Sequence, residues 1–162
     1  MTGNNSTDRS KLGTKRHILT DKKGLPLSDV ISSASTYDIK LVVNVVDNTV
    51  ITRKGKVKGR GRQHLCLDKG YKSAREEQEL IKRGYVLHIP NKKKRKWENE
   101  EEVKVIPFRK KYSPKRWVVE RTNSWHNRFR KLFTRYEKKA ENYLGLIQFS
   151  CCIVIYRKII LG

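Results

Sequence analysis

Two acidic residues, Asp68 and Glu120, stand where a carboxylate could hold a metal ion beside a polyanion. Asp68 follows the short apolar run His64–Leu67, which predicts a β-strand. Glu120 lies within Arg116–Tyr136, a run without Gly or Pro that reads as a basic helix. Phosphodiester chemistry commonly uses Mg²⁺ or Mn²⁺ held by carboxylates, because these hard cations prefer oxygen ligands. Asp68 and Glu120 are therefore candidate catalytic residues and metal ligands.

Both carboxylates also have a purely structural interpretation. Arg116 precedes Glu120 by four residues, and such a helical ion pair contributes roughly 0.2–0.5 kcal/mol, less in the Arg-before-Glu orientation. Asp68 precedes Lys69-Gly70, so its side chain could cap a turn. The residues alone leave these alternatives open.

The segment Arg116–Tyr136 is predicted to form one long helix after Pro114. At helical spacing its apolar side chains make a single stripe, and the other face carries Glu120 among cations. The predicted stripe consists of Val118, Trp125, Phe129, Leu132 and Tyr136.

The charge of the chain points to a polyanionic partner. Thirty-eight basic against sixteen acidic residues give a net charge of +22 and a pI near 10.2. Nucleic acid is the first candidate partner and an anionic membrane surface the second. The predicted phosphate-contacting residues are the cationic run after Asn91 and cations of the long helix, namely Lys92, Lys93, Lys94, Arg95, Lys96, Arg121, Arg128, Arg130 and Lys131.

Cysteine, histidine and hydropathy patterns favour a reduced, cytoplasmic protein. The three cysteines form no CxxC pair and make a poor disulfide framework, and the four histidines lack zinc spacing. The polar N-terminus does not resemble a signal peptide. The most apolar segment, Tyr143–Tyr156, is interrupted by polar residues and shorter than a membrane span, so a buried helix and no membrane partner are expected.

The first part of the chain predicts a hairpin followed by a helix. Residues 15–32 read as two extended runs around the turn Asp21–Gly24. Asp38–Val50 has helical apolar spacing, and Asp38 is the expected cap. Residues 54–62 form a basic, Gly-rich loop.

The middle of the chain predicts a βαβ unit with parallel strands. The strand His64–Leu67 is followed by a helix that begins at Ser73, with Glu76 in a capping box, and ends at Gly84. The run Tyr85–Ile89 is the second strand. Lys138–Gly162 predicts the last helix. The expected domains are a flexible arm, 1–14, and an α/β domain, 15–162, with a basic and acidic inserted loop at 91–113.

Residues 11–157 resemble the C-terminal part of bacterial insertion-sequence transposases of the DDE type. The resemblance rests on pieces in the family's order: KLGTKRHILTD (11–21) with GLPL (24–27), STYD (35–38), LDKGY (67–71) and RWVVERTNSW (116–125). It implies an RNase H-like fold, a mixed sheet flanked by helices. It further implies Mg²⁺ (or Mn²⁺), transposon-end and target double-stranded DNA as partners, and DNA cleavage and rejoining in the bacterial cytoplasm at the nucleoid.

The resemblance assigns roles to individual residues. Asp68 corresponds to the second catalytic acid and Glu120 to the third, and Arg116 and Tyr71 correspond to supporting residues. Three positions depart from the family pattern: Tyr37 replaces a His, Tyr112 lies one residue too far from Arg116, and Asn127 takes the place of a cation, next to Arg128.

The first catalytic Asp of the family lies upstream of the part that resembles residues 2–13. The chain is therefore expected to be a truncated or second-frame transposase that lacks the first strand. Its expected partners are an upstream-frame N-terminal segment and further copies of itself, since unpaired sheet edges favour association. The alternative is a catalytically inactive, basic DNA-binding fragment. A ribosome-associated basic protein would explain the charge and leave the ordered motifs unexplained.

Overall fold

The computed structural model describes residues 2–5, 9–51, 63–90 and 116–161. The chain forms two compact units, one of residues 1–55 with 116–162 and one of residues 56–115. The first unit contains β1 (Gly3–Asn4), β2 (Leu12–Thr20), β3 (Pro26–Ser33), the 3₁₀ helix η1 (Asp38–Leu41), α1 (Val42–Asp47), α3 (Arg116–Asn127), α4 (Arg130–Phe133) and α5 (Ala140–Ile159). The second contains β4 (Gln63–Cys66), the 3₁₀ helix η2 (Lys69–Tyr71), α2 (Ala74–Lys82) and β5 (Tyr85–His88).

The first unit is built on an antiparallel sheet in the order β1-β2-β3. The predicted hairpin is confirmed, with His17 opposite Val30. Its turn is held by Asp21, whose Oδ1 accepts hydrogen bonds from the Lys23 and Leu25 amides (2.8 Å each). Strands β1 and the start of β2 lie within the segment expected to be a flexible arm, so residues 3–4 and 12–14 are paired strand instead.

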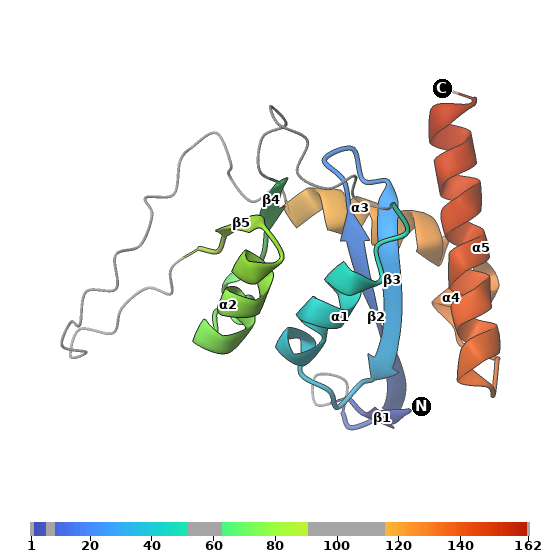
Figure 1. The fold of residues 1–162 in the computed structure, drawn as a ribbon. Helices are drawn as coiled ribbons and strands as arrows, with labels where there is room; N and C mark the ends of the chain where they lie inside the picture. Colours follow the sequence, from blue (N-terminus) through green and yellow to red (C-terminus); the bar gives the residue numbers. More distant parts are fainter. Residues whose placement is uncertain (1, 6–8, 52–62, 91–115, 162) are drawn as a thin grey trace. The chain divides into compact units, whose positions relative to one another are not determined.

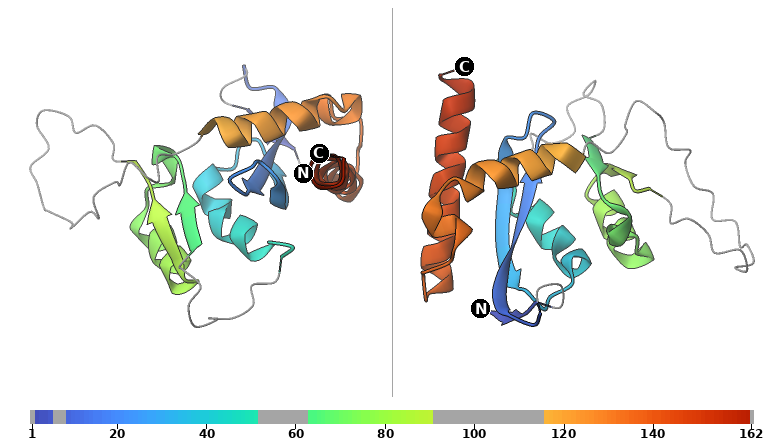
Figure 2. Two further views of the ribbon diagram at one scale, coloured as in Figure 1. Left: turned by 90° about the horizontal axis from the view of Figure 1, so that it is seen from above. Right: turned by 180° about the vertical axis from the view of Figure 1, so that it is seen from behind.

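The two faces of the hairpin contact different helices. Helix α1 packs on one side of β2 and β3, while α3 and α5 pack on the other, as the two views of Figure 2 show. Alternation along the strands explains this arrangement: His17 bonds Ser32 on one face (2.8 Å), and Arg16 reaches Asn127 of α3 on the other (2.7 Å). The sheet is thus the middle layer of the unit.

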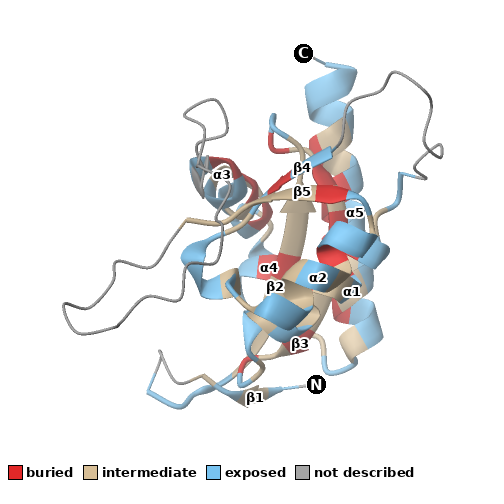
Figure 3. Ribbon diagram, turned by 60° about the vertical axis from the view of Figure 1, so that its left-hand side comes forward, coloured by how far each residue is buried: buried red, intermediate tan, exposed pale blue. Residues whose placement is uncertain are grey.

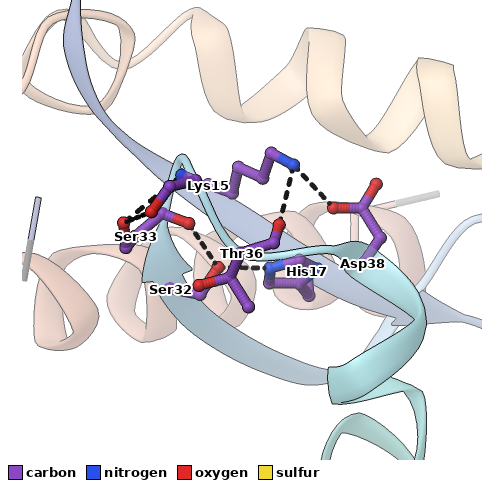
Figure 4. Close-up of polar contacts among 7 residues, drawn as sticks. Lys15, His17, Ser32, Ser33, Thr36 and Asp38 are labelled. Atoms are coloured by element: carbon purple, nitrogen blue, oxygen red, sulfur yellow. Dashed lines mark hydrogen bonds and ion pairs between the residues drawn. The ribbon is translucent and has the colours of Figure 1, made fainter. Parts of the chain in front are cut away.

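The predicted helix Asp38–Val50 is shorter than expected and begins differently. A 3₁₀ turn precedes α1, which ends at Asp47, and Tyr37 rather than Asp38 occupies the cap position. The Asp38 carboxylate instead pairs with Lys15 Nζ (3.0 Å), which also donates to the Thr36 carbonyl oxygen (Figure 4). The prediction of Asp38 as a cap was wrong because its carboxylate forms an ion pair with Lys15 of β2.

The predicted single helix Arg116–Tyr136 is interrupted. Helix α3 ends at Asn127, Phe129 is extended, and α4 covers only Arg130–Phe133. No Gly or Pro occurs at this break. Phe129, at the break, and Leu132 of α4 both pack with buried residues of α5, and such tertiary contacts can override helix propensity.

Helix α5 supplies the core of the first unit. Its buried side chains are Tyr143, Ile147, Ser150, Cys151 and Val154. The Tyr143 hydroxyl donates to the Leu132 carbonyl oxygen (3.2 Å), and Ile31 of β3 packs against the same cluster. Figure 3 shows buried residues along one side of α5 and exposed residues toward its C-terminal end. The predicted buried helix is therefore confirmed on one face. Among the described residues, no helix is long and apolar enough to span a membrane.

The second unit confirms the predicted βαβ arrangement. Strands β4 and β5 are parallel, and α2 connects them and buries Leu80. The capping box differs in detail: the Ser73 amide donates to Glu77 (3.2 Å), while Glu76 contacts the Ser73 hydroxyl. In place of the expected single mixed sheet, the described residues form one antiparallel and one parallel sheet.

Gly24 is expected to be intolerant of a side chain. Its φ is +84°, and a Cβ there would lie 3.1 Å from both the Arg121 guanidinium and the Thr122 hydroxyl. Gly84 is the matched control because its φ is +85° with nothing within 4 Å. Gly84→Ala should cost about 1–2 kcal/mol from backbone strain, and Gly24→Ala about 1 kcal/mol more. Urea unfolding measures both, and equal costs would contradict a close approach of α3 to the turn.

Candidate active site

Asp68 lies two residues after the end of β4 and is the N-cap of the 3₁₀ turn η2. Its Oδ1 accepts a hydrogen bond from the Lys69 amide (2.7 Å), so the side chain does cap the turn. The side chain is nevertheless exposed. The Tyr71 amide donates to the Asp68 carbonyl oxygen (3.0 Å), which fixes the backbone of the turn. A capping role and a ligand role are therefore compatible for Asp68, because the residue is exposed.

Glu120 projects from α3 because the opposite side of this helix is anchored. Val118 and Thr122 are buried, and Glu120, two residues from each, lies roughly 200° around the helix. The Thr122 hydroxyl donates to the Gly24 carbonyl oxygen (2.7 Å), and Arg121 donates to the Lys23 carbonyl oxygen. These contacts tie α3 to the hairpin turn and hold Glu120 at the exposed surface of the helix.

The cations predicted to contact DNA have different surroundings. Arg128, Arg130 and Lys131 are exposed. The Arg121 guanidinium lies over the rings of Trp117 (4.7 Å) and Trp125 (5.1 Å), so this side chain orders α3. Lys92–Lys96 lie outside the described residues, as do the Gly-rich loop 54–62 and the inserted loop 91–113. Arg116 is the first residue of α3, and Tyr71 is the last residue of η2.

The structure also contains a buried polar cluster that the apolar pattern of the sequence did not indicate. His126 has no exposed surface and lies 3.7 Å from the Cys151 thiol, Nε2 to Sγ. Burial, with the nearby Arg16 charge, lowers the pKa of His126 to about 4. Burial, with Asp29 and Cys152 nearby, raises the pKa of Cys151 to about 12, so the thiol is neutral and a poor nucleophile. The spacing of Val118, Thr122 and His126 by four residues was the sequence signal that these side chains share one face of the helix.

A histidine pair joins the two parallel strands of the second unit. His64 Nδ1 and His88 Nε2 are 2.7 Å apart, and the rings are stacked with centroids 5.0 Å apart. Partial burial lowers the pKa of His88, and the nearby charge of His64 lowers it further. The strand register sets Cys66 opposite His88, and His64, two residues before Cys66, therefore lies on the same face as His88. The three cysteines, all in the described part of the chain, are free.

The candidate ligands suit a hard divalent cation in donor type. Asp68 and Glu120 are exposed residues, and they carry carboxylate oxygens, the donors that Mg²⁺ and Mn²⁺ prefer. Within the described residues, no group of three or more His, Cys, Asp or Glu side chains could hold a metal ion. Asp68 belongs to the second unit and Glu120 to the first, and each fits on its own as one ligand of a metal site that needs further donors.

Comparison with known proteins agrees with the resemblance to DDE-type transposases. The Transposase DDE domain family matches residues 2–155. A Burkholderia cepacia protein assigned as a transposase of insertion sequence element IS402 is 33% identical over 157 residues, which span 96% of this chain and 68% of the relative. No solved structure matches the chain. The observed helices and sheets are compatible with an RNase H-like domain.

Proposed function

This chain belongs to the DDE-type transposases of insertion sequences, and we propose that it carries out Mg²⁺-dependent cleavage and joining of transposon-end DNA with Asp68 and Glu120. The observation that carries the proposal is the placement of Glu120. It is an exposed carboxylate on a helix whose opposite face is fixed to the hairpin turn. A catalytic carboxylate needs this combination of a rigid backbone and an exposed position.

Asp68 supports the proposal through its place in the second unit. It follows the carboxyl end of a parallel strand, where ligand-binding residues of α/β sheets gather. Its turn is held by hydrogen bonds from the Lys69 and Tyr71 amides, so its carboxylate starts from a defined backbone position. Asp68 and Glu120 are the proposed metal ligands, and Arg116 and Tyr71 the proposed supporting residues.

The proposed chemistry divides between the ion and the side chains. When bound, Mg²⁺ or Mn²⁺ supplies charge that activates a nucleophile and stabilises the leaving oxygen of the phosphodiester. Asp68 and Glu120 supply the oxygen ligands. The exposed cations Arg128, Arg130 and Lys131 neutralise DNA phosphates and position the strand. The cationic run Lys92–Lys96 is proposed to add phosphate contacts.

A cleavage assay tests this proposal. The chain is incubated with a labelled duplex that carries the transposon end, alone and together with the N-terminal segment proposed as its partner. We expect nicking at the end sequence with Mg²⁺ or Mn²⁺ in the combined sample and no nicking with EDTA. Metal-independent nicking, or no nicking by the combined sample, would contradict the proposal.

The second candidate function is DNA binding without catalysis, which the net charge of +22 favours. Binding through phosphate contacts weakens with salt by a log–log slope of about −0.9 per contact on duplex DNA. We expect a steep slope for this chain, measured by fluorescence anisotropy with a duplex. A flat salt dependence would exclude phosphate contacts as the main attraction. Salt-sensitive binding without nicking would favour this second function.

A further inference from the structure

A groove between α3 and α5 combines aromatic and cationic side chains. It encloses about 440 Å³ and is lined by Trp125, Arg128, Phe129, Ile153, Val154, Arg157 and Lys158. All of these residues belong to the first unit, and the C-terminal part of α3 lies beside α5 in both views of Figure 2. Trp125 and Phe129 are half-buried, whereas Arg128, Arg157 and Lys158 are exposed. The groove therefore has an aromatic wall and a cationic rim.

The charge of the groove has one sign. Three of its lining residues are cations and none is acidic. The ammonium of Lys158 lies 5.3 Å from the centre of the Trp125 ring, and the Arg121 guanidinium lies 5.1 Å from it. Such cation–π contacts orient the charges around the ring. An anionic ligand with a flat apolar face would match both features of the groove.

We propose that this groove binds an unpaired stretch of DNA, with a base against Trp125 and Phe129 and the flanking phosphates on Arg128, Arg157 and Lys158. Sites for single-stranded nucleic acid commonly pair aromatic surfaces with a cationic track in this way. The proposal rests on the proposed DNA function. It adds that the bound DNA is single-stranded and that the binding surface is separate from Asp68 and Glu120.

Duplex DNA fits the groove less well than an unpaired strand. In a duplex the bases are paired and stacked, so only phosphates can meet the exposed rim cations. An unpaired strand can turn a base toward the half-buried rings as well, which adds the contact of Trp125 and Phe129 to the phosphate contacts. The groove should therefore distinguish the two forms of DNA, whereas general positive charge should not.

Two sets of variants separate the groove from the net charge. The groove set is Arg128→Ala, Arg157→Ala and Lys158→Ala combined. The matched control removes the same charge from exposed lysines of the first unit that do not line the groove, namely Lys22→Ala, Lys40→Ala and Lys139→Ala. A further variant, Trp125→Leu, removes the aromatic ring and keeps an apolar side chain, and its fold is checked by circular dichroism.

Binding is measured by anisotropy with labelled oligo-dT and with a duplex of the same number of phosphates. We expect Trp125→Leu to weaken oligo-dT binding about tenfold, with a change of less than about threefold on the duplex. The groove set should weaken oligo-dT binding about tenfold more than it weakens duplex binding, because its cations also contact duplex phosphates. The control set should weaken both probes alike. Equal losses from the groove and control sets, or equal losses on the two probes, would overturn the proposal. Duplex binding without oligo-dT binding by the unmodified chain overturns this inference alone, whereas binding to neither probe overturns the DNA function as well.

Discussion

Replacing Glu120 with Gln, or Asp68 with Asn, is expected to lower the rate of DNA strand cleavage by at least about 10³-fold. The rate is that of the chain combined with its proposed N-terminal partner. Each change removes a charged oxygen ligand and leaves the side-chain volume nearly unchanged. The charge stabilisation supplied by a catalytic metal amounts to several kcal/mol, which corresponds to this factor. The measurement is the single-turnover rate of nicking at the labelled transposon end with saturating Mg²⁺.

The controls for this prediction are two exposed acids of the first unit that have no role in the proposed site. Asp47 lies at the end of α1 and Glu141 in the first turn of α5. Asp47→Asn and Glu141→Gln make the same charge change and should keep the nicking rate within about threefold, as surface substitutions usually do. All four variants should bind the duplex at least as tightly as the unmodified chain, because each loses a negative charge. Nicking that survives Glu120→Gln would remove Glu120 from the proposed site.

Acidification is expected to destabilise the first unit through His126. The folded pKa is about 4 and the ordinary value is 6.5, so the unfolded chain binds more protons between these values. The stabilisation is fully present above pH 6.5 and is lost as the pH falls toward 4. The pKa shift corresponds to a loss of about 3 kcal/mol in the free energy of unfolding. The neutral Cys151 thiol beside the ring gives the imidazolium no counter-charge. The positive charge of Arg16 further disfavours the protonated ring.

Urea unfolding as a function of pH measures this effect. His126→Gln removes the titrating group, and its stability should fall less steeply between pH 6.5 and 4. His17 and His88 also have lowered pKa values and remain in both proteins, so the difference between the curves isolates His126. Ser150→Ala is the control, since it removes a buried hydroxyl that does not titrate. Parallel curves for His126→Gln and the unmodified chain would exclude His126 as the cause.

Local sequence signals predicted much of the fold. The turn residues Asp21 and Gly24 predicted the hairpin of β2 and β3. The strand pattern around α2 predicted the parallel pairing of β4 with β5. The break at Phe129 was not predictable in this way, because it serves contacts with α5 that no local pattern records. The cap assigned to Asp38 failed for a related reason, since Lys15 is distant in sequence and adjacent in space.

The candidate site shows the same division. The motif order singled out Asp68 and Glu120, and both are exposed at the surface of regular elements. The helical stripe of α3 was assigned by apolarity, so it omitted Thr122 and His126, which are fully buried. Periodicity identifies a buried face only when its residues are apolar. The anchor that orients Glu120 is a hydroxyl, and its partner lies 98 residues away.

The most direct test of the central claim is a metal-specificity switch at the proposed ligands. Asp68→Cys and Glu120→Cys replace a hard oxygen ligand with a softer thiolate, which accepts Mn²⁺ more readily than Mg²⁺. If these side chains bind the catalytic metal, nicking by each variant should be lost with Mg²⁺ and largely recovered with Mn²⁺. Activity with Mg²⁺ comparable to that of the unmodified enzyme would contradict direct ligation by Asp68 and Glu120.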